Sequence, residues 1–158
     1  MKVIFLDIDG VLNCQYMHQD TSDEIIKTPG GKLSKRRINL TNELIDKTDA
    51  KIVISSTWRV DDGVDGYLVD AGLKADIIGK TPVFNDRFSL RGNEIHAWIV
   101  ENEKLIGKPY HDYHSFVILD DDSDMLLWHR ENYFQTDTYT GLTPNIVYRA
   151  ERFLNRYS

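Results

Sequence analysis

The amino-acid sequence predicts an α/β fold, a three-layer sandwich in which helices cover both faces of a mostly parallel central sheet. Two observations carry this prediction. Residues 2–8, 51–55 and 115–119 are apolar runs rich in β-branched and aromatic side chains, as in strands buried on both faces of a sheet. Segments with apolar residues at helical spacing lie between these runs, and such alternation is typical of parallel strands joined by crossover helices.

Length and composition bound the class of protein. With 158 residues, 41% of them hydrophobic and 28% charged, the chain is long enough for one globular domain over residues 1–158 and is unlike a disordered chain. The formal charge of -6 disfavours indiscriminate binding to nucleic acid. Cys14 is the only cysteine, which excludes an intramolecular disulfide and fits a reducing compartment.

The apolar stretch at residues 3–6 is interrupted by Asp7 and Asp9. It is too short for a signal peptide or a membrane span. We therefore expect a soluble, cytoplasmic protein without a membrane partner, and the sequence leaves its oligomeric state open.

Shorter signals assign the remaining elements. Residues 13–32 are polar and contain Pro29-Gly30-Gly31, which predicts a long loop or a small excursion. Ser34, between Leu33 and Ile38, is placed as the N-cap of a helix over 35–48. The elements that follow are a short helix within 61–71, a strand at 76–79, a loop at 82–90, a helix over 92–103 that begins just after Arg91, a strand at 132–136, and a final helix capped by Thr143 and started by Pro144.

Polar side chains follow each of the three buried strands. Asp7 and Asp9 come after the first, a Ser-Ser-Thr group at 55–57 after the second, and three aspartates at 120–122 after the third. In a parallel sheet these carboxyl ends meet at one edge, where ligands of such folds bind. Two groups of carboxylates at that edge repel one another unless a cation lies between them or some of them take up protons.

The chemistry that this pattern favours is phosphoryl transfer through an aspartate. A carboxylate can attack phosphorus, but both partners are anionic, so a divalent metal is needed to neutralise the encounter. Mg²⁺ suits that role because it takes oxygen ligands, commonly one or two carboxylates together with a substrate phosphate and water. A second carboxyl group two residues further on lies on the same side of an extended chain and can protonate the leaving oxygen. A hydroxyl and a cationic side chain would hold the phosphoryl oxygens.

The residues at the strand ends resemble the motifs of the haloacid dehalogenase (HAD) superfamily. Residues 7–12 (Asp-Ile-Asp-Gly-Val-Leu), 55–57 and 120–121 are similar to its motifs one, two and four, in the same order and each after a strand. Residues 55–59, 91–95 and the stretch from Asp137 to Thr143 resemble the small uncapped HAD domains of phage and RNA-repair proteins. The resemblance implies a Rossmannoid sandwich and a Mg²⁺-dependent phosphomonoester hydrolase that acts through an aspartyl phosphate.

The resemblance also implies roles for the acidic residues. Asp7 would be the nucleophile, and Asp9 the general acid and base. The Mg²⁺ ligands would be Asp7, the backbone carbonyl of Asp9, Asp120 and Asp121. An alternative register places Asp124, instead of Asp121, as the second acidic position beside Asp120.

Phosphate contacts follow from the same resemblance. Ser55 would donate to the phosphate, with Ser56 as the alternate. The superfamily usually supplies a lysine in motif three, whereas the matching position here is Arg91. Arginine binds phosphate well through its fork of donors, so function need not be lost. Lys80 and Lys108 stay as further candidates for this cation.

The spacing of the motifs leaves no room for a sizeable cap domain. Residues 12–51 and 58–90 hold only short elements and connections, whereas HAD enzymes acting on small metabolites commonly carry an inserted cap. We therefore expect an open active site and a bulky phosphorylated substrate, such as a nucleotide or the end of a nucleic acid. A basic run at Lys32, Lys35, Arg36 and Arg37 is a candidate guide for a phosphate-bearing chain.

A different class, a receiver-like or non-catalytic phosphate-binding signalling module, also carries acidic residues at strand ends. In that class, two consecutive acidic residues follow the first strand, whereas Asp7 and Asp9 are separated by one residue. This spacing favours the enzyme, because it provides an acid and base beside the nucleophile.

A few conspicuous side chains are interpreted as structural. His111 and His114 lack a third ligand nearby in sequence and are expected at the surface. Trp98 and Trp128 are expected in the core. Arg59 is predicted either to orient phosphate or to pair with an acidic residue.

Overall fold

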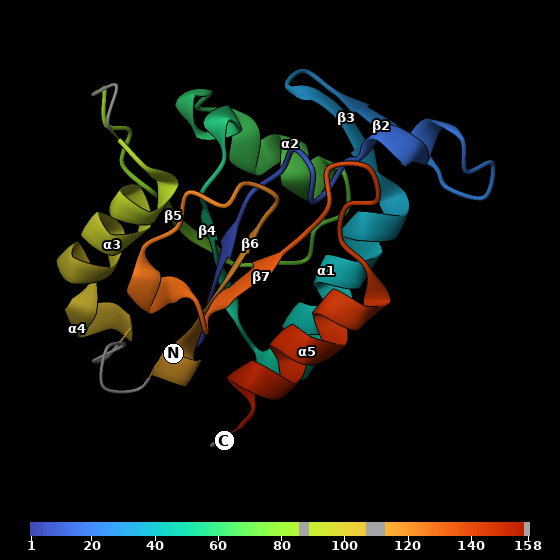
Figure 1. Ribbon diagram of the computed structural model, residues 1–158. Helices are drawn as coiled ribbons and strands as arrows, with labels where there is room; N and C mark the ends of the chain where they lie inside the picture. Colours follow the sequence, from blue (N-terminus) through green and yellow to red (C-terminus); the bar gives the residue numbers. More distant parts are fainter. Residues whose placement is uncertain (86–88, 107–112, 157–158) are drawn as a thin grey trace.

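The computed structural model of the protein describes residues 1–85, 89–106 and 113–156. Its centre is a five-stranded sheet in which all neighbouring strands run parallel, in the order β5-β4-β1-β6-β7 (Figure 1). The strands are β1 (Val3–Leu6), β4 (Lys51–Ile54), β5 (Ile77–Lys80), β6 (Phe116–Asp120) and β7 (Tyr133–Gln135). The parallel sheet predicted from the apolar runs is confirmed.

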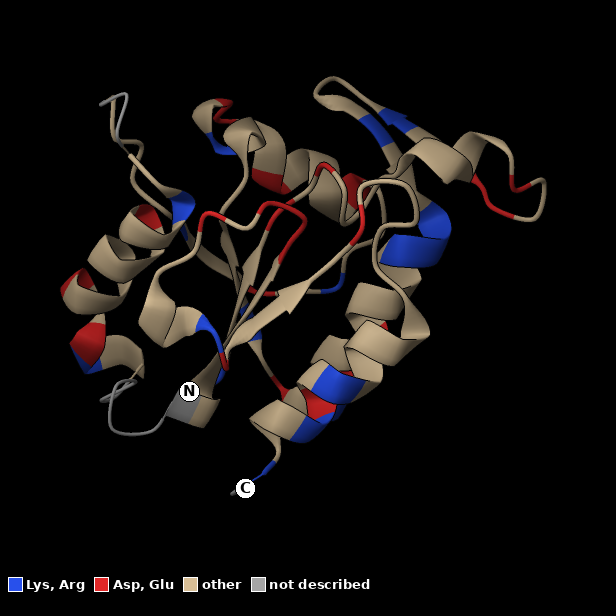
Figure 2. Ribbon diagram, viewed as in Figure 1, with Lys and Arg blue, Asp and Glu red and all other residues tan. Residues whose placement is uncertain are grey.

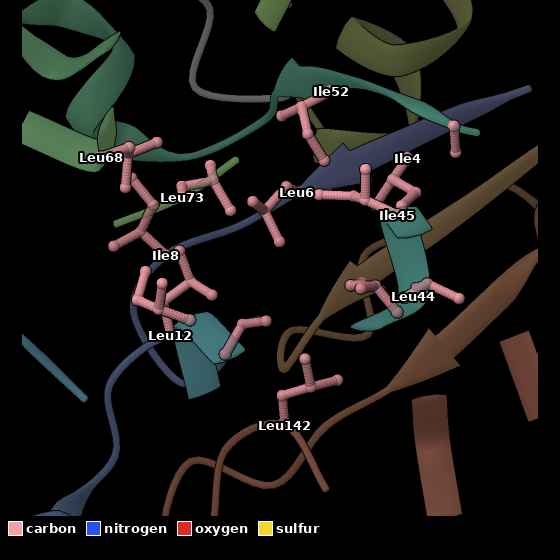
Figure 3. Packing of buried hydrophobic residues seen from close by; sticks show 14 of the residues in the cluster. Ile4, Leu6, Ile8, Leu12, Leu44, Ile45, Ile52, Leu68, Leu73 and Leu142 are labelled. Atoms are coloured by element: carbon pink, nitrogen blue, oxygen red, sulfur yellow. The ribbon is translucent and has the colours of Figure 1, made fainter. Parts of the chain in front are cut away.

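Helices cover both faces of this sheet, which gives the three predicted layers (Figure 1). One face packs against α1 (Lys35–Thr48), α2 (Val64–Asp70) and α5 (Pro144–Leu154), and the other against α3 (Arg91–Glu101) and α4 (Glu103–Ile106). Alternation along β1 divides its side chains between the two cores. Ile4 and Leu6 join Leu44, Ile45 and Leu68 in the larger one (Figure 3), and Val3 and Phe5 join Trp98 in the smaller one.

The segment predicted as a long loop or small excursion contains regular structure. A 3₁₀ turn (Gln15–His18) is followed by an antiparallel hairpin of β2 (Ile25–Thr28) and β3 (Gly31–Ser34), which projects from the body of the molecule near the start of α1 (Figure 1). Pro29 and Gly30 form its turn. The hairpin is small, so the prediction that no sizeable cap is present is confirmed for the residues that the structure describes.

Capping residues begin two helices where the sequence indicated. The Ser34 hydroxyl accepts a hydrogen bond from the Arg37 amide at the start of α1. The Thr143 hydroxyl accepts one from the Ile146 amide at the start of α5. Each cap satisfies one of the amide groups that a helix leaves unpaired in its first turn.

Two interpretations of conspicuous side chains are wrong. Trp98 is buried as expected, but Trp128 is 59% exposed. It lies in a 3₁₀ turn, Leu127–His129, where successive side chains point in different directions and His129 takes the inward position. His114 is buried rather than superficial, because it precedes β6 and its ring packs on Phe153 of α5 at 4.5 Å.

The remaining short elements are two 3₁₀ turns, Thr57–Val60 and Tyr113–Ser115. His111, expected at the surface, lies outside the described residues. Among the residues that the structure describes, no helix combines the length and apolar composition that crossing a membrane would require.

Candidate active site

Three carboxylates gather at the carboxyl ends of the two central strands. Asp7 directly follows β1, Asp120 ends the neighbouring β6, and Asp121 comes next. The Asp7 amide donates to the Leu119 carbonyl at 3.0 Å, which continues the pairing of the strands to this point. One carboxylate oxygen from each of the three residues lies within 4.8 Å of the others. Figure 2 shows acidic segments collected at this end of the sheet.

Burial and mutual repulsion perturb this carboxylate cluster. Burial raises the pKa of Asp120 to about 8, and the negative charge of Asp7 adds to the rise. Burial likewise raises the pKa of Asp7 to about 6, although a hydrogen bond from Ser56 and the charge of Arg91 oppose the rise. Oδ2 of Asp120 is buried and has no hydrogen-bond partner among the described residues. A buried carboxylate oxygen without a hydrogen bond, beside two other carboxylates, is an arrangement that a hard divalent cation such as Mg²⁺ stabilises.

Gly10 makes room for one member of the cluster. Its φ of 75° lies in the left-handed region, and a Cβ at this position would lie 2.2 Å from Oδ2 of Asp121. The Thr138 hydroxyl donates to the same oxygen at 2.6 Å. Asp121 is thus held from two sides, and any other residue in place of Gly10 would displace it.

Asp9 lies outside the cluster and is exposed. Both of its carboxylate oxygens accept hydrogen bonds: Oδ1 from Nδ2 of Asn13 at 2.8 Å, and Oδ2 from Nε1 of Trp58 at 3.0 Å. Asn13 is fixed in turn, because its Oδ1 accepts from the Gly10 amide and its Nδ2 also donates to the Lys32 carbonyl. The side chain of Asp9 is therefore oriented by groups from two other segments.

The turn of the β2-β3 hairpin lies against the indole of Trp58. A Cβ on Gly30 would lie 2.7 Å from a ring carbon of Trp58, and one on Gly31 would lie 2.8 Å from another. Only glycine permits so close an approach of backbone to the ring. The hairpin thus packs against Trp58, the residue that hydrogen-bonds Asp9.

The two serines after β4 have different surroundings. Ser56 is fully buried, and its side chain hydrogen-bonds Asp7. The Ser55 hydroxyl is buried without a hydrogen-bond partner among the described residues. The structure therefore brings Ser56, the alternate in the sequence prediction, into contact with Asp7.

Arg59 fixes the backbone of this same segment. Its guanidinium donates to the carbonyls of Ser56, Thr81 and Pro82, at 2.6, 3.0 and 3.1 Å. It also pairs with Glu94 at 2.6 Å, with both side chains almost fully buried. Of the two predicted roles, pairing with an acidic residue is the one that the structure shows.

Arg91, at the first position of α3, reaches the acidic cluster. Its Nε lies 3.7 Å from Oδ2 of Asp120, and its Nη1 lies 3.5 Å from Glu94. Arg59, Val83, Phe84 and Asp124 join it around an open depression of about 280 Å³ beside the cluster. A phosphate bound next to Asp7 would find this guanidinium within reach.

The other candidates are placed away from the cluster or outside the described residues. Asp124 accepts a hydrogen bond from the Arg91 amide at 2.8 Å and so caps α3, which makes Asp121 the partner of Asp120 within the cluster. Lys80 pairs with Asp65 at 3.4 Å. Lys108 lies outside the described residues.

The basic run at the start of α1 is engaged in local ion pairs. Arg37 is buried, pairs with Asp23 at 2.8 Å and donates to the Thr140 carbonyl. Arg36 pairs with Asp20. Two of the four residues of the predicted guide for a phosphate-bearing chain, Arg36 and Arg37, are therefore neutralised by acidic residues of the preceding loop.

Three residues of the site were not assigned by sequence reasoning: Asn13, Trp58 and Thr138. Each acts by a hydrogen bond to an aspartate distant in the sequence or across a turn. For Trp58, the available sequence signal is the Gly30-Gly31 pair, because adjacent glycines in a turn can mark a close approach to a bulky side chain.

Comparison with models of known protein families gives a match over most of the chain. A family model for the HAD domain in Swiss Army Knife RNA repair proteins matches residues 3–147, which include every strand and every site residue described above. Among curated proteins, none matches this chain significantly.

Proposed function

Since the chain belongs to the family of HAD domains found in Swiss Army Knife RNA repair proteins, we propose that it hydrolyses phosphomonoesters through a covalent intermediate on Asp7. The observation that carries this proposal is the cluster of Asp7 and Asp120, both buried, and the partly buried Asp121, with Asp9 beside it. The three carboxylates, with the backbone carbonyl of Asp9, would hold Mg²⁺. When bound, the ion would neutralise the negative charge that opposes the approach of a phosphate to Asp7.

In the first step, a carboxylate oxygen of Asp7 forms a bond to phosphorus while the bond from phosphorus to the ester oxygen breaks. Asp9 gives its proton to that departing oxygen. In the second step, Asp9 takes a proton from water, whose oxygen attacks phosphorus. The bond between phosphorus and Asp7 breaks, so inorganic phosphate leaves and the carboxylate is regenerated.

Arg91 and a serine hydroxyl would hold the phosphoryl oxygens during both steps. Arg91 is suited to this because it lies at the rim of the cluster and its charge already acts on Asp7. Ser56 is favoured over Ser55 by its hydrogen bond to Asp7.

Release of phosphate from p-nitrophenyl phosphate tests the activity. We expect many turnovers with Mg²⁺ and none with excess EDTA, and complete loss in Asp7→Asn, because an amide does not attack phosphorus. Asp46→Asn, an exposed aspartate on α1, is the control for loss of one negative charge. A single, long-lived phosphorylation of Asp7 without turnover would instead support the receiver-like alternative.

We further propose that the substrate is the phosphorylated end of a nucleic acid. The absence of a sizeable cap leaves the site open to a bulky substrate, and the matching family consists of domains of RNA repair proteins. The test compares kcat/KM for a mononucleotide 3′- or 5′-phosphate with that for a matching oligonucleotide end. A clear preference for the mononucleotide would contradict this part of the proposal.

A further inference from the structure

Helix α5 and the residues just after it carry a stripe of three arginines. Arg149 and Arg152, three residues apart, lie on one side of α5, and Arg156, two residues beyond the end of the helix, lines the same groove. All three are exposed. Figure 2 shows these basic segments on the lower part of α5, near the C-terminal end of the described chain.

The stripe forms one wall of an open groove of about 500 Å³ between α5 and β7, the edge strand of the sheet. Arg130, which precedes β7, also lines the groove. Among the lining residues are four arginines, four aromatic side chains and a single carboxylate, Glu131. The groove is therefore a concentrated positive patch on a chain whose formal charge is -6.

Most of this positive charge is not neutralised by the protein. Arg130 pairs with Glu131 at 3.3 Å, and both side chains are largely exposed. Within the described part of the chain, no carboxylate lies in ion-pair distance of Arg149, Arg152 or Arg156. The contrast with Arg36 and Arg37, which pair with acidic neighbours, distinguishes this patch from the basic run at the start of α1.

Aromatic rings alternate with the guanidinium groups. Arg149 lies over the ring of Phe134, with its Cζ 5.6 Å from the ring centroid. Arg152 lies over Tyr148 at 5.7 Å and donates to its hydroxyl at 2.9 Å. Tyr148 is 54% exposed, so one large ring is available to a ligand at the mouth of the groove.

We propose that this groove binds a single-stranded segment of nucleic acid. Guanidinium groups pair with successive phosphates, and an exposed aromatic ring stacks with a base, which is how proteins hold single strands without reading their sequence. An acidic polypeptide would pair with the arginines, but it would place no base against the exposed ring of Tyr148. The combination therefore favours nucleic acid.

The far end of the groove is separate from the acidic cluster, whereas Phe134 at its near end pairs with Leu119, the residue before Asp120. Asn155, just after α5, accepts a hydrogen bond from Lys2 at the start of β1, whereas Asp7 follows the end of that strand. Residues 2–7 span roughly 16 Å at about 3.3 Å per residue of strand. A strand that bridges the two places would need on the order of five nucleotides at the stacked duplex spacing of about 3.4 Å each, and fewer where it is extended. The groove thus gives a reason why a longer nucleic acid would bind better than a mononucleotide.

Fluorescence anisotropy with a labelled ten-nucleotide single-stranded RNA tests the proposal. The RNA carries no terminal phosphate, so its binding does not depend on phosphatase activity. The experiment can therefore contradict RNA binding by the groove without contradicting the proposed phosphatase activity, and the phosphatase assay can do the reverse. We expect Arg149→Glu/Arg156→Glu to weaken binding at least tenfold at low salt. The slope of log K against log salt should fall by about 0.7 for each phosphate that no longer pairs with an arginine.

Matched variants separate the groove from bulk charge. Lys74→Glu/Lys104→Glu makes the same change of net charge at exposed positions away from the groove and should alter affinity less than twofold. Tyr148→Ala should weaken RNA binding about fivefold or more, because a base can no longer stack on the ring. Equal losses in the two double variants, or no binding by the wild-type protein, would overturn the proposal. Equal binding of poly-glutamate, with the same dependence on Arg149 and Arg156, would overturn the assignment to nucleic acid.

Discussion

Trp58 and Asp9 are joined by a hydrogen bond of 3.0 Å from the indole Nε1 to a carboxylate oxygen, across 49 positions of the sequence. The indole ring also meets the hairpin turn, whose glycines touch it. The orientation of Asp9 therefore depends on a segment that contributes no group of its own to the carboxylate cluster.

Trp58→Phe should slow the reaction most for substrates with poor leaving groups. Phenylalanine keeps an aromatic ring at this position but lacks the Nε1 donor, so Asp9 loses one of its two partners. Because protonation matters most for basic leaving groups, we expect kcat to fall roughly tenfold for an alkyl phosphate and little for p-nitrophenyl phosphate. Trp128→Phe, at an exposed position, is the control. A uniform loss across leaving groups would show that Trp58 has only a structural role.

Gly10→Ala should weaken Mg²⁺ binding. Its methyl group would overlap Asp121, and the left-handed backbone adds strain of about 1–2 kcal/mol. We expect at least a tenfold weaker affinity in a calorimetric titration. Gly66→Ala is a sharp control, because a Cβ there meets nothing within 4 Å and glycine inside α2 costs about 0.5–1 kcal/mol relative to alanine. The second variant should therefore melt higher and bind Mg²⁺ normally.

Asp120→Asn should stabilise the metal-free protein at pH 8. The pKa of Asp120 is raised from 3.8 to about 8 by burial and by Asp7, so the folded state binds more protons than the unfolded state between these values. Its contribution to stability is therefore full below pH 3.8 and is lost as pH rises toward 8. The variant removes this loss, and we expect a gain of more than about 1 kcal/mol at pH 8 in urea unfolding with EDTA.

Asp120→Asn should also lose the stabilisation that we expect Mg²⁺ to give to the wild-type protein. Asp46→Asn, at an exposed position on α1, should change neither property. If Asp120→Asn were less stable than wild type at pH 8 without metal, repulsion within the cluster would not be a significant cost of folding.

His129 should make the protein sensitive to acid. Burial lowers the pKa of its imidazole from 6.5 to about 4, and His96 adds to the effect. The unfolded state thus binds more protons between pH 4 and pH 6.5, so stability is full above 6.5 and is lost as pH falls toward 4.

His129→Leu should reduce the loss of stability between pH 6.5 and pH 4, by on the order of 2 kcal/mol at pH 4. Neither ring nitrogen of His129 has a hydrogen-bond partner among the described residues, so the replacement removes no hydrogen bond. Thermal melts from pH 4 to pH 8 measure the effect. An unchanged slope in the variant would assign the acid sensitivity to other groups.

The sequence predicts the parts of the fold that depend on local patterns. The apolar runs identify β1, β4 and β6 because each is buried on both faces, and Ser34 and Thr143 begin helices through their own hydroxyl groups. The hairpin is not predicted as strands, because Ile25 and Ile26 are only half-buried and Lys27 and Lys32 interrupt any apolar alternation.

Tertiary contacts explain where sequence reasoning about side chains was wrong. Trp128 and His129 are adjacent, and only the direction of a short 3₁₀ turn decides that the histidine is buried and the tryptophan exposed. Arg37 is predicted from the sequence as part of a guide for a phosphate-bearing chain, although Asp23 and the Thr140 carbonyl bind it in the interior. Such pairings arise from chain segments that meet only in the folded protein.

The position of β1 between β4 and β6 has a consequence for how the carboxylate cluster forms during folding. Asp7 and Asp120 come from distant parts of the chain, and they meet only after Leu6 has aligned with Leu119. Non-local strand pairing of this kind is slow, because the loop between the strands must first be closed. A chain that has formed only the β1-β4 pair therefore lacks two of the three clustered carboxylates, and uptake of Mg²⁺ would report the completion of the central sheet.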